Sequence, residues 1–127
     1  GDDGYPKPVW DKKTGTIDHS VAQSMKDHGF DLRAYAASHW PEIGPDLVDK
    51  IQIRVGDMDN FYLNLAVYLF EDFLKTTTHP AAHGTVLYGR PMKGHGWQGQ
   101  TNADLLREMA AHIKAHAPRG SRTAWVY

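Results

Sequence analysis

The chain of 127 residues contains no cysteine, which excludes disulfide bonds, zinc–thiolate sites and a thiol nucleophile but is compatible with any compartment. No apolar run approaches the roughly 20 residues of a membrane-spanning helix, so we expect no membrane partner. The formal net charge of −1 gives no electrostatic reason to expect nucleic acid as a partner. The sequence carries no motif that calls for a cofactor.

The amino-acid composition, with 41% hydrophobic and 23% charged residues, is ordinary for a folded soluble protein. The length corresponds to one domain. We expect an extended arm over residues 1–15, a single α/β domain over residues 16–118 and a tail over residues 119–127. The chain starts with Gly1 rather than methionine, which indicates either an artificially chosen boundary or a cut from a longer protein.

The central part of the chain predicts a strand, a helix and a second strand. Residues 51–55 alternate in polarity and are rich in β-branched side chains, a pattern typical of a strand. Residues 61–75 are apolar at helical spacing and predict a long helix capped by Asn60. A second short strand is predicted over residues 85–88. A helix between two strands indicates that the strands are parallel.

Further helices are predicted on both sides of this unit. Asp18 is the predicted N-cap of a first helix, and a second short helix over residues 31–39 is expected to stop before Pro41. Thr101 or Asn102 is expected to cap a last helix. The predicted fold class is therefore α/β: a small parallel β-α-β-α unit with an N-terminal helical region and an extended arm.

A carboxylate and an imidazole follow the ends of the two predicted strands. Asp59 lies three residues after Gly56, and His95 stands between two glycines shortly after the second strand. Ligands bind beyond the carboxyl ends of the strands in α/β sheets, so we expect these two groups to meet there. A carboxylate fixes the tautomer of an imidazole and supports the imidazolium that forms when it takes a proton. The spacing therefore predicts a catalytic pair.

The residues around this pair resemble a known family. The segment Val55-Gly56-Asp57-Met58-Asp59-Asn60-Phe61-Tyr62-Leu63, the helix after it and Gly94-His95-Gly96-Trp97 are similar to the C-terminal end of an esterase-type α/β-hydrolase. The similarity covers about residues 50–116. It implies that Asp59 is the triad acid, with Asp57 as second choice, and that His95 is the base. It also implies a carboxyl-ester substrate.

The family's serine nucleophile has no counterpart in this sequence. The motif Gly-x-Ser-x-Gly is absent, because no serine has glycines both two positions before it and two positions after it. The serines are Ser20, Ser24, Ser38 and Ser121. The chain thus resembles a truncated or minimal α/β-hydrolase, in which an Asp–His pair alone would orient a water molecule as general base.

Four residues near the pair are candidates for substrate binding. Trp97 and Tyr62 offer aromatic surface for a bulky or aromatic ester. Lys93 and Arg90 offer positive charge for a carboxylate or an oxyanion. The other reading of the aromatic residues is packing of the tails, which include Trp125 and Tyr127, or a subunit interface.

Two further interpretations remain open. His112 and His116 lie one helical turn apart, and His79 and His83 lie close in a loop, so paired imidazoles could bind zinc or nickel, although a polar helix face gives the same pattern. Alternatively, the chain is a non-catalytic binding or assembly module with a hydrolase-derived fold. A two-stranded sheet exposes both edges, so we also expect a homo-oligomer, a dimer or larger.

Overall fold

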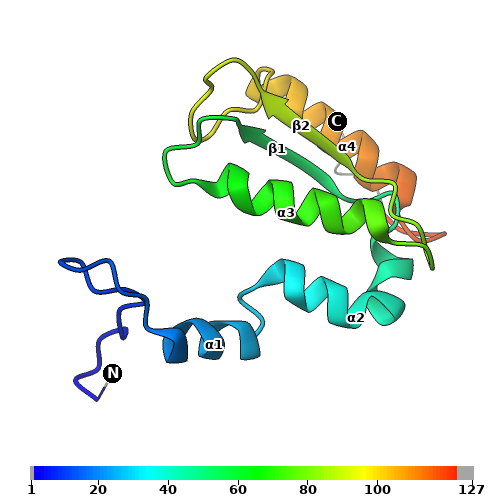
Figure 1. The fold of residues 1–127 in the computed structure, drawn as a ribbon. Coiled ribbons are helices and arrows are strands. Elements are labelled where there is room, and N and C mark those ends of the chain that lie inside the picture. Colours follow the sequence, from blue (N-terminus) through cyan, green and yellow to red (C-terminus); the bar gives the residue numbers. More distant parts are fainter. Residues whose placement is uncertain (1, 123–127) are drawn as a thin grey trace. The chain divides into compact units, whose positions relative to one another are not determined.

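The computed structural model describes residues 2–122 (Figure 1). Along the chain the elements are α1 (His19–Asp27), α2 (Leu32–Leu47), β1 (Gln52–Gly56), α3 (Leu63–Thr76), β2 (Thr85–Gly89) and α4 (Asn102–His116). The predicted mixed α/β class with a small parallel sheet is confirmed. No helix within residues 2–122 is long and apolar enough to cross a membrane. The predicted aromatic tail with Trp125 and Tyr127 lies outside the described residues.

The chain divides into two compact units, Gly1–Trp40 and Pro41–Tyr127, and the division falls within α2. A division by packing does not by itself define domains, so the predicted arm, single domain and tail stay predictions. The sheet, α3, α4 and the candidate site all belong to the second unit.

The first unit contains α1 and the polar segment before it. Asp18 is the N-cap of α1, as predicted, and accepts hydrogen bonds from the amides of Ser20 and Val21. Within the predicted arm, a turn at Asp11 closes a short antiparallel bridge between Trp10 and Ile17. The stretch from Trp10 to Ile17 therefore folds back on itself just before α1.

The predicted end of α2 is wrong. Instead of stopping before Pro41, the helix continues to Leu47 with Pro41 and Pro45 inside it. Three buried residues, Ala36, Trp40 and Gly44, follow each other at a spacing of four through this stretch. This continuous buried stripe outweighs the local preference of proline to end a helix.

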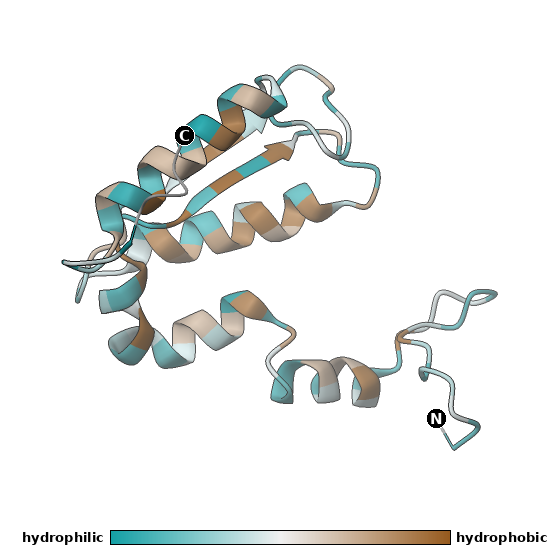
Figure 2. Ribbon diagram, turned by 180° about the vertical axis from the view of Figure 1, so that it is seen from behind, coloured by the Kyte–Doolittle hydropathy of each residue, from teal (hydrophilic) through white to brown (hydrophobic). Residues whose placement is uncertain are grey.

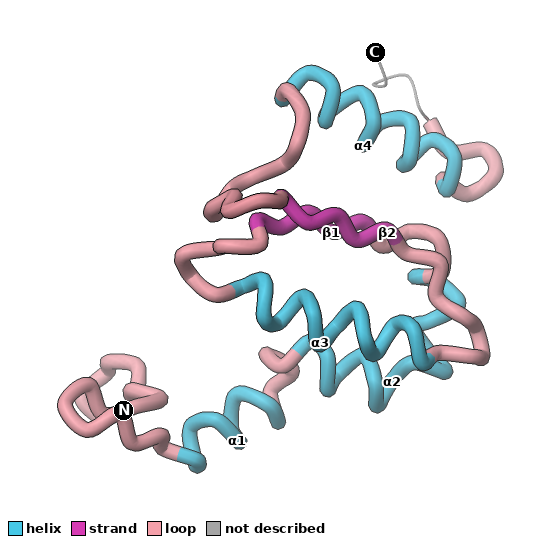
Figure 3. Tube along the Cα trace, turned by 45° about the horizontal axis from the view of Figure 1, so that its top comes forward, coloured by secondary structure: helices cyan, strands magenta, loops and turns pink. Residues whose placement is uncertain are grey.

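The second unit is built on a two-stranded parallel sheet, in which Gln52 pairs with Thr85 and Gly56 with Gly89. Figure 3 shows α3 and α4 on opposite faces of this sheet. Figure 2 shows hydrophobic residues along β1 and along α3, which pack together as the core of this unit. Val55 of β1 and Leu74 of α3 are among its buried side chains.

The two faces of the sheet differ in chemistry. On the α3 face, the Tyr88 hydroxyl donates a hydrogen bond of 2.7 Å to Glu71 of the helix. On the α4 face, two polar contacts link β1 to the helix: an ion pair between Arg54 and Glu108, and a hydrogen bond between the Gln52 amide and His112. The helix α4 is thus held to the sheet by polar side chains of β1.

Candidate active site

Each strand ends in a glycine, and the loop after β2 folds back across both strand ends. A Cβ atom on Gly56 would lie 2.1 Å from the carbonyl oxygen of Lys93. A Cβ atom on Gly89 would lie 2.4 Å from Cδ2 of Trp97. Only glycine leaves room for the Lys93 backbone at Gly56 and for the Trp97 side chain at Gly89. The two glycines therefore allow the loop that carries His95 to reach the end of β1.

Backbone and side-chain hydrogen bonds join this loop to the turn that follows β1. The Met58 amide donates to the Lys93 carbonyl at 3.0 Å, and the Lys93 amide donates to Oδ1 of Asp57 at 3.1 Å. The His95 amide donates to Oδ1 of Asn60 at 3.1 Å. The two loops after the strands are thus held together at three points.

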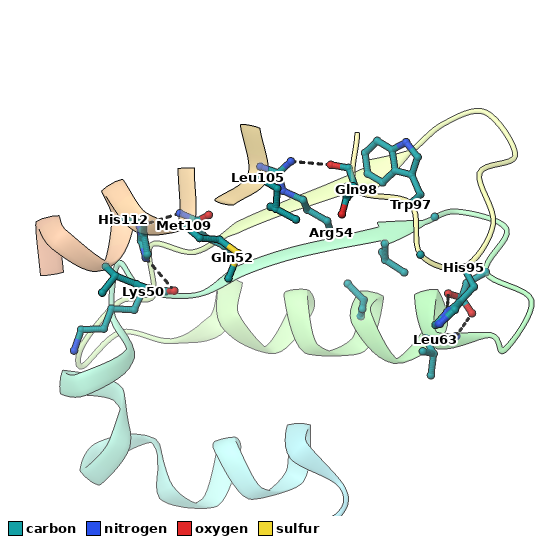
Figure 4. A pocket seen from close by; sticks show the side chains of 16 residues that line it. Lys50, Gln52, Arg54, Leu63, His95, Trp97, Gln98, Leu105, Met109 and His112 are labelled. Atoms are coloured by element: carbon teal, nitrogen blue, oxygen red, sulfur yellow. Dashed lines mark hydrogen bonds and ion pairs between the residues drawn. The ribbon is translucent and has the colours of Figure 1, made fainter. Parts of the chain in front are cut away.

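This arrangement places the imidazole of His95 against the carboxylate of Asp59, as predicted. Nδ1 of His95 lies 2.8 Å from Oδ2 of Asp59, and Figure 4 marks this contact with a dashed line at His95. The His95 ring also makes an edge-to-face contact with the Phe61 ring, with a centroid distance of 4.8 Å. The Asp59 residue is 4% exposed, whereas the His95 side chain is 49% exposed. A buried acid therefore holds the Nδ1 side of the ring, while about half of the His95 side chain stays exposed.

Asp59 also starts the helix α3. Its Oδ1 accepts a hydrogen bond of 2.8 Å from the Phe61 amide and a longer one of 3.5 Å from the Leu63 amide. The helix begins at Leu63, after Tyr62 in a left-handed conformation, so the prediction of Asn60 as the cap is wrong. Asn60 holds the His95 amide instead. One carboxylate therefore serves both the helix and the histidine.

The protonation of Asp59 follows from opposing effects. Burial raises the pKa of the Asp59 carboxyl. The hydrogen bonds from His95 and from the Phe61 and Leu63 amides, together with the electrostatic effect of His95, lower this pKa by more than burial raises it. The net pKa lies below the ordinary value, so the group is a carboxylate at neutral pH. This charge is what an imidazole needs to hold its proton on Nδ1 and to accept another on Nε2.

A cleft of about 560 Å³ opens beside the pair and runs along β1 (Figure 4). Asp59, His95 and Trp97 line it, so the structure brings these three predicted site residues together. Apolar side chains from α3 and α4 form its walls: Leu63, Val67, Leu105, Met109 and Ile113. The cleft thus joins a histidine to an apolar surface.

The other predicted site residues do not line this cleft. Asp57 binds the Lys93 amide, and the described contacts of His95 do not include it. Tyr62 is 73% exposed at the start of α3. The guanidinium of Arg90 lies over the Tyr88 ring, 5.0 Å from its centroid. These side chains contact other parts of the fold or the solvent.

Three residues that position the pair escaped the sequence-based prediction. They are Asn60, Phe61 and Asn64, whose side-chain amide donates to the Asp57 carbonyl at 3.1 Å. Asn60 and Phe61 directly follow Asp59 in the sequence, so polar and aromatic neighbours of a candidate acid were the available signal. Asn64 is buried near the start of an apolar helix, where an amide needs a partner.

No described serine hydroxyl of the second unit bonds to His95. Ser121, the serine of this unit, donates to the Pro118 carbonyl after the end of α4.

The described histidine pairs also have other partners. Both ring nitrogens of His112 are engaged, by Gln52 and by the Lys50 carbonyl, and residues 2–122 hold no cluster of three metal-ligating side chains.

Comparison of the chain with protein-family models, with curated proteins and with solved structures finds no match.

Proposed function

We propose that this chain is a hydrolase-like module that acts on carboxylic esters through Asp59 and His95. The observation that carries the proposal is the 2.8 Å contact between Nδ1 of His95 and the buried carboxylate of Asp59. The order of elements supports the α/β-hydrolase resemblance, because an acid follows β1 and a histidine follows the adjacent parallel strand β2.

In the proposed reaction, Asp59 orients the ring and His95 acts as general base. Nε2 accepts a proton from a water molecule as the water oxygen attacks the ester carbonyl. The imidazolium then returns this proton to the departing alkoxide as the carbon–oxygen bond breaks. Such positioned proton transfer contributes typically about 10²–10⁴-fold in rate. A pair without a serine nucleophile is therefore a weak catalyst compared with a complete triad.

The surroundings of His95 favour an apolar ester. Four large apolar residues near the turns after β1 and β2 are largely exposed: Met58, Phe61, Tyr62 and Met92. Phe61 touches the imidazole itself. Exposed apolar side chains next to a reactive group offer binding surface for a bulky or aromatic acyl or alcohol group.

Hydrolysis of p-nitrophenyl acetate and p-nitrophenyl benzoate tests this proposal. We expect turnover that is lost in His95→Ala and strongly reduced in Asp59→Asn. The matched control is His83→Ala, because Nδ1 of His83 lies 3.2 Å from Asp49 but both side chains are exposed. Activity that survives His95→Ala, or that falls equally in His83→Ala, would rule out the assigned pair.

A non-catalytic assembly module is the second candidate. The described sheet has two strands, so the outer edge of β2 carries backbone groups without a strand partner. An open edge pairs readily with another strand, and pairing of two β2 strands would give a homo-oligomer. Sedimentation equilibrium of the pure chain should then give a dimer or larger, with no ester turnover; a monomer over the micromolar range contradicts it.

A further inference from the structure

The Trp97 side chain lies apart from the His95 ring, although only one residue separates them in the sequence. Figure 4 shows the indole beside Gln98 and Arg54, whereas His95 lies next to Leu63 at the start of α3. Arg54 forms its ion pair with α4. The indole is therefore on the α4 side of the strand ends, and the imidazole is on the α3 side.

Gly96 makes this separation possible. In an extended segment, side chains two residues apart point to the same side, so His95 and Trp97 would lie together. Gly96 has a φ of +77°, in the left-handed region that residues with a side chain rarely adopt. The turn at Gly96 breaks the alternation and directs Trp97 away from His95.

The indole packs directly against the backbone of two glycines. A Cβ atom on Gly89 would lie 2.8 Å from Cε2 of Trp97, and one on Gly99 would lie 2.9 Å from Cζ2. Both distances are shorter than the roughly 3.5 Å at which carbon atoms pack. Gly89 is the buried last residue of β2, so the ring rests on a fixed part of the sheet. Arg54 also donates to the Gln98 carbonyl at 2.8 Å and holds the chain directly after the indole.

The loop that carries His95 needs such an anchor because of its composition. Three of the six residues 94–99 are glycines, which have the largest backbone freedom to lose on folding. At the His95 amide, the chain is held by Oδ1 of Asn60. Two residues later it is held by the packing of Trp97. The place of His95 in space therefore depends on a fixed point on each side of Gly96.

We propose that Trp97 is a positioning residue of the Asp59–His95 pair. Its indole fixes the loop to the end of β2 and thereby keeps the imidazole against the carboxylate. In this proposal Trp97 supports the pair instead of binding the ester. The effect of Trp97 on hydrolysis rests on the proposed function, whereas its effect on the His95 ring follows from the packing alone.

The kinetics of Trp97→Ala with two esters separate support of the pair from binding of the ester. A displaced base lowers kcat for every ester, and a shift of about 1 Å can cost about 100-fold. We expect kcat to fall by about 10–100-fold for both p-nitrophenyl acetate and p-nitrophenyl benzoate, with KM changed by less than about twofold. A KM that rises mainly for the benzoate, with kcat unchanged, would show an aromatic binding surface and overturn the proposal.

The ¹⁵N NMR spectrum of the His95 ring in its neutral form provides a second readout, which needs no turnover. We expect the preference for a proton on Nδ1 to be lost in Trp97→Ala. Trp97→Phe keeps a ring against Gly89 but is too short to reach Gly99, so it retains more of the packing and should lose the preference only in part.

The matched control for this readout is Leu74→Ala. Leu74 is buried near the C-terminal end of α3, whereas Asp59 precedes the start of this helix, so the variant weakens the fold without touching the loop. The His95 preference should persist in it. An unchanged preference in both Trp97 variants, or an equal loss in Leu74→Ala, would overturn the proposal. If the original chain hydrolyses neither ester, the proposed function fails, and the NMR comparison still decides whether Trp97 positions His95.

Discussion

The substitution Gly56→Ala tests how the end of β1 builds the site. A Cβ atom there would lie 2.1 Å from the Lys93 carbonyl oxygen and 2.3 Å from the Gly94 carbonyl oxygen. Carbon and oxygen atoms that are not bonded pack at about 3.3 Å or more, so the loop must move by about 1 Å. Both atoms belong to backbone, which cannot rotate away as a flexible side chain would.

This displacement should reduce both stability and activity. Overpacking of this kind typically costs about 1–3 kcal/mol of unfolding free energy. A shift of about 1 Å at a reacting group can lower the rate by about 100-fold, and His95 is the next residue in the displaced loop. Urea unfolding measures the first effect, and kcat/KM for p-nitrophenyl acetate measures the second.

The matched control is Gly94→Ala in the same loop. There a Cβ atom would meet only Oδ1 of Asn60, at 3.3 Å, which a small adjustment accommodates. We expect a loss of less than about 1 kcal/mol in this variant. If Gly56→Ala is as stable and as active as Gly94→Ala, the close approach of the loop to β1 does not exist as described.

Three other predictions concern Asp59 and the contact of β2 with α3. Asp59→Ala should lower the Tm by about 5 °C relative to Asp59→Asn, because only alanine removes the oxygen that accepts the amides at the start of α3; equal Tm values in calorimetry would contradict this role. The pKa of Asp59 is lower in the folded chain than in the unfolded chain. The ionised carboxylate therefore adds stability above the unfolded pKa of about 3.9, and this stability is lost as the pH falls through the folded pKa. Between pH 6 and pH 2, the urea midpoint should thus fall less steeply in Asp59→Asn than in the original chain. Tyr88→Phe should cost about 1 kcal/mol at neutral pH through loss of the hydrogen bond to Glu71. Burial raises the pKa of Tyr88, so the stability that the neutral hydroxyl contributes is lost as the pH rises above the unfolded pKa of about 10. Tyr88→Phe should therefore lose less stability in alkali than the original chain. A parallel decline of the two proteins in urea unfolding at alkaline pH would refute this role of Tyr88.

Local patterns predicted the parts of the fold that local chemistry decides. Alternating β-branched residues identified β1, and Asp18 identified the start of α1. For α4 the prediction named Thr101 or Asn102 as the cap, and the structure has Thr101. The approach of Asp59 to His95 followed from the parallel order of two strands, because groups after neighbouring parallel strands meet at one edge.

Long-range packing decides what the sequence alone did not predict. The helix α2 passes through Pro41 because its buried stripe continues on both sides of it. Asn60 follows the pattern of a helix cap, yet its oxygen accepts the amide of His95, a residue 35 positions away. Such a partner is known only once the loop after β2 has folded back.

The most direct test of the central claim, that Asp59 holds His95 as an oriented base, is ¹⁵N NMR of the His95 ring in its neutral form. The account predicts a tautomer with the proton on Nδ1 and an unprotonated Nε2, and loss of this preference in Asp59→Asn. A His95 ring with its proton on Nε2, or one that averages between tautomers in the same way with and without the Asp59 carboxylate, would contradict it.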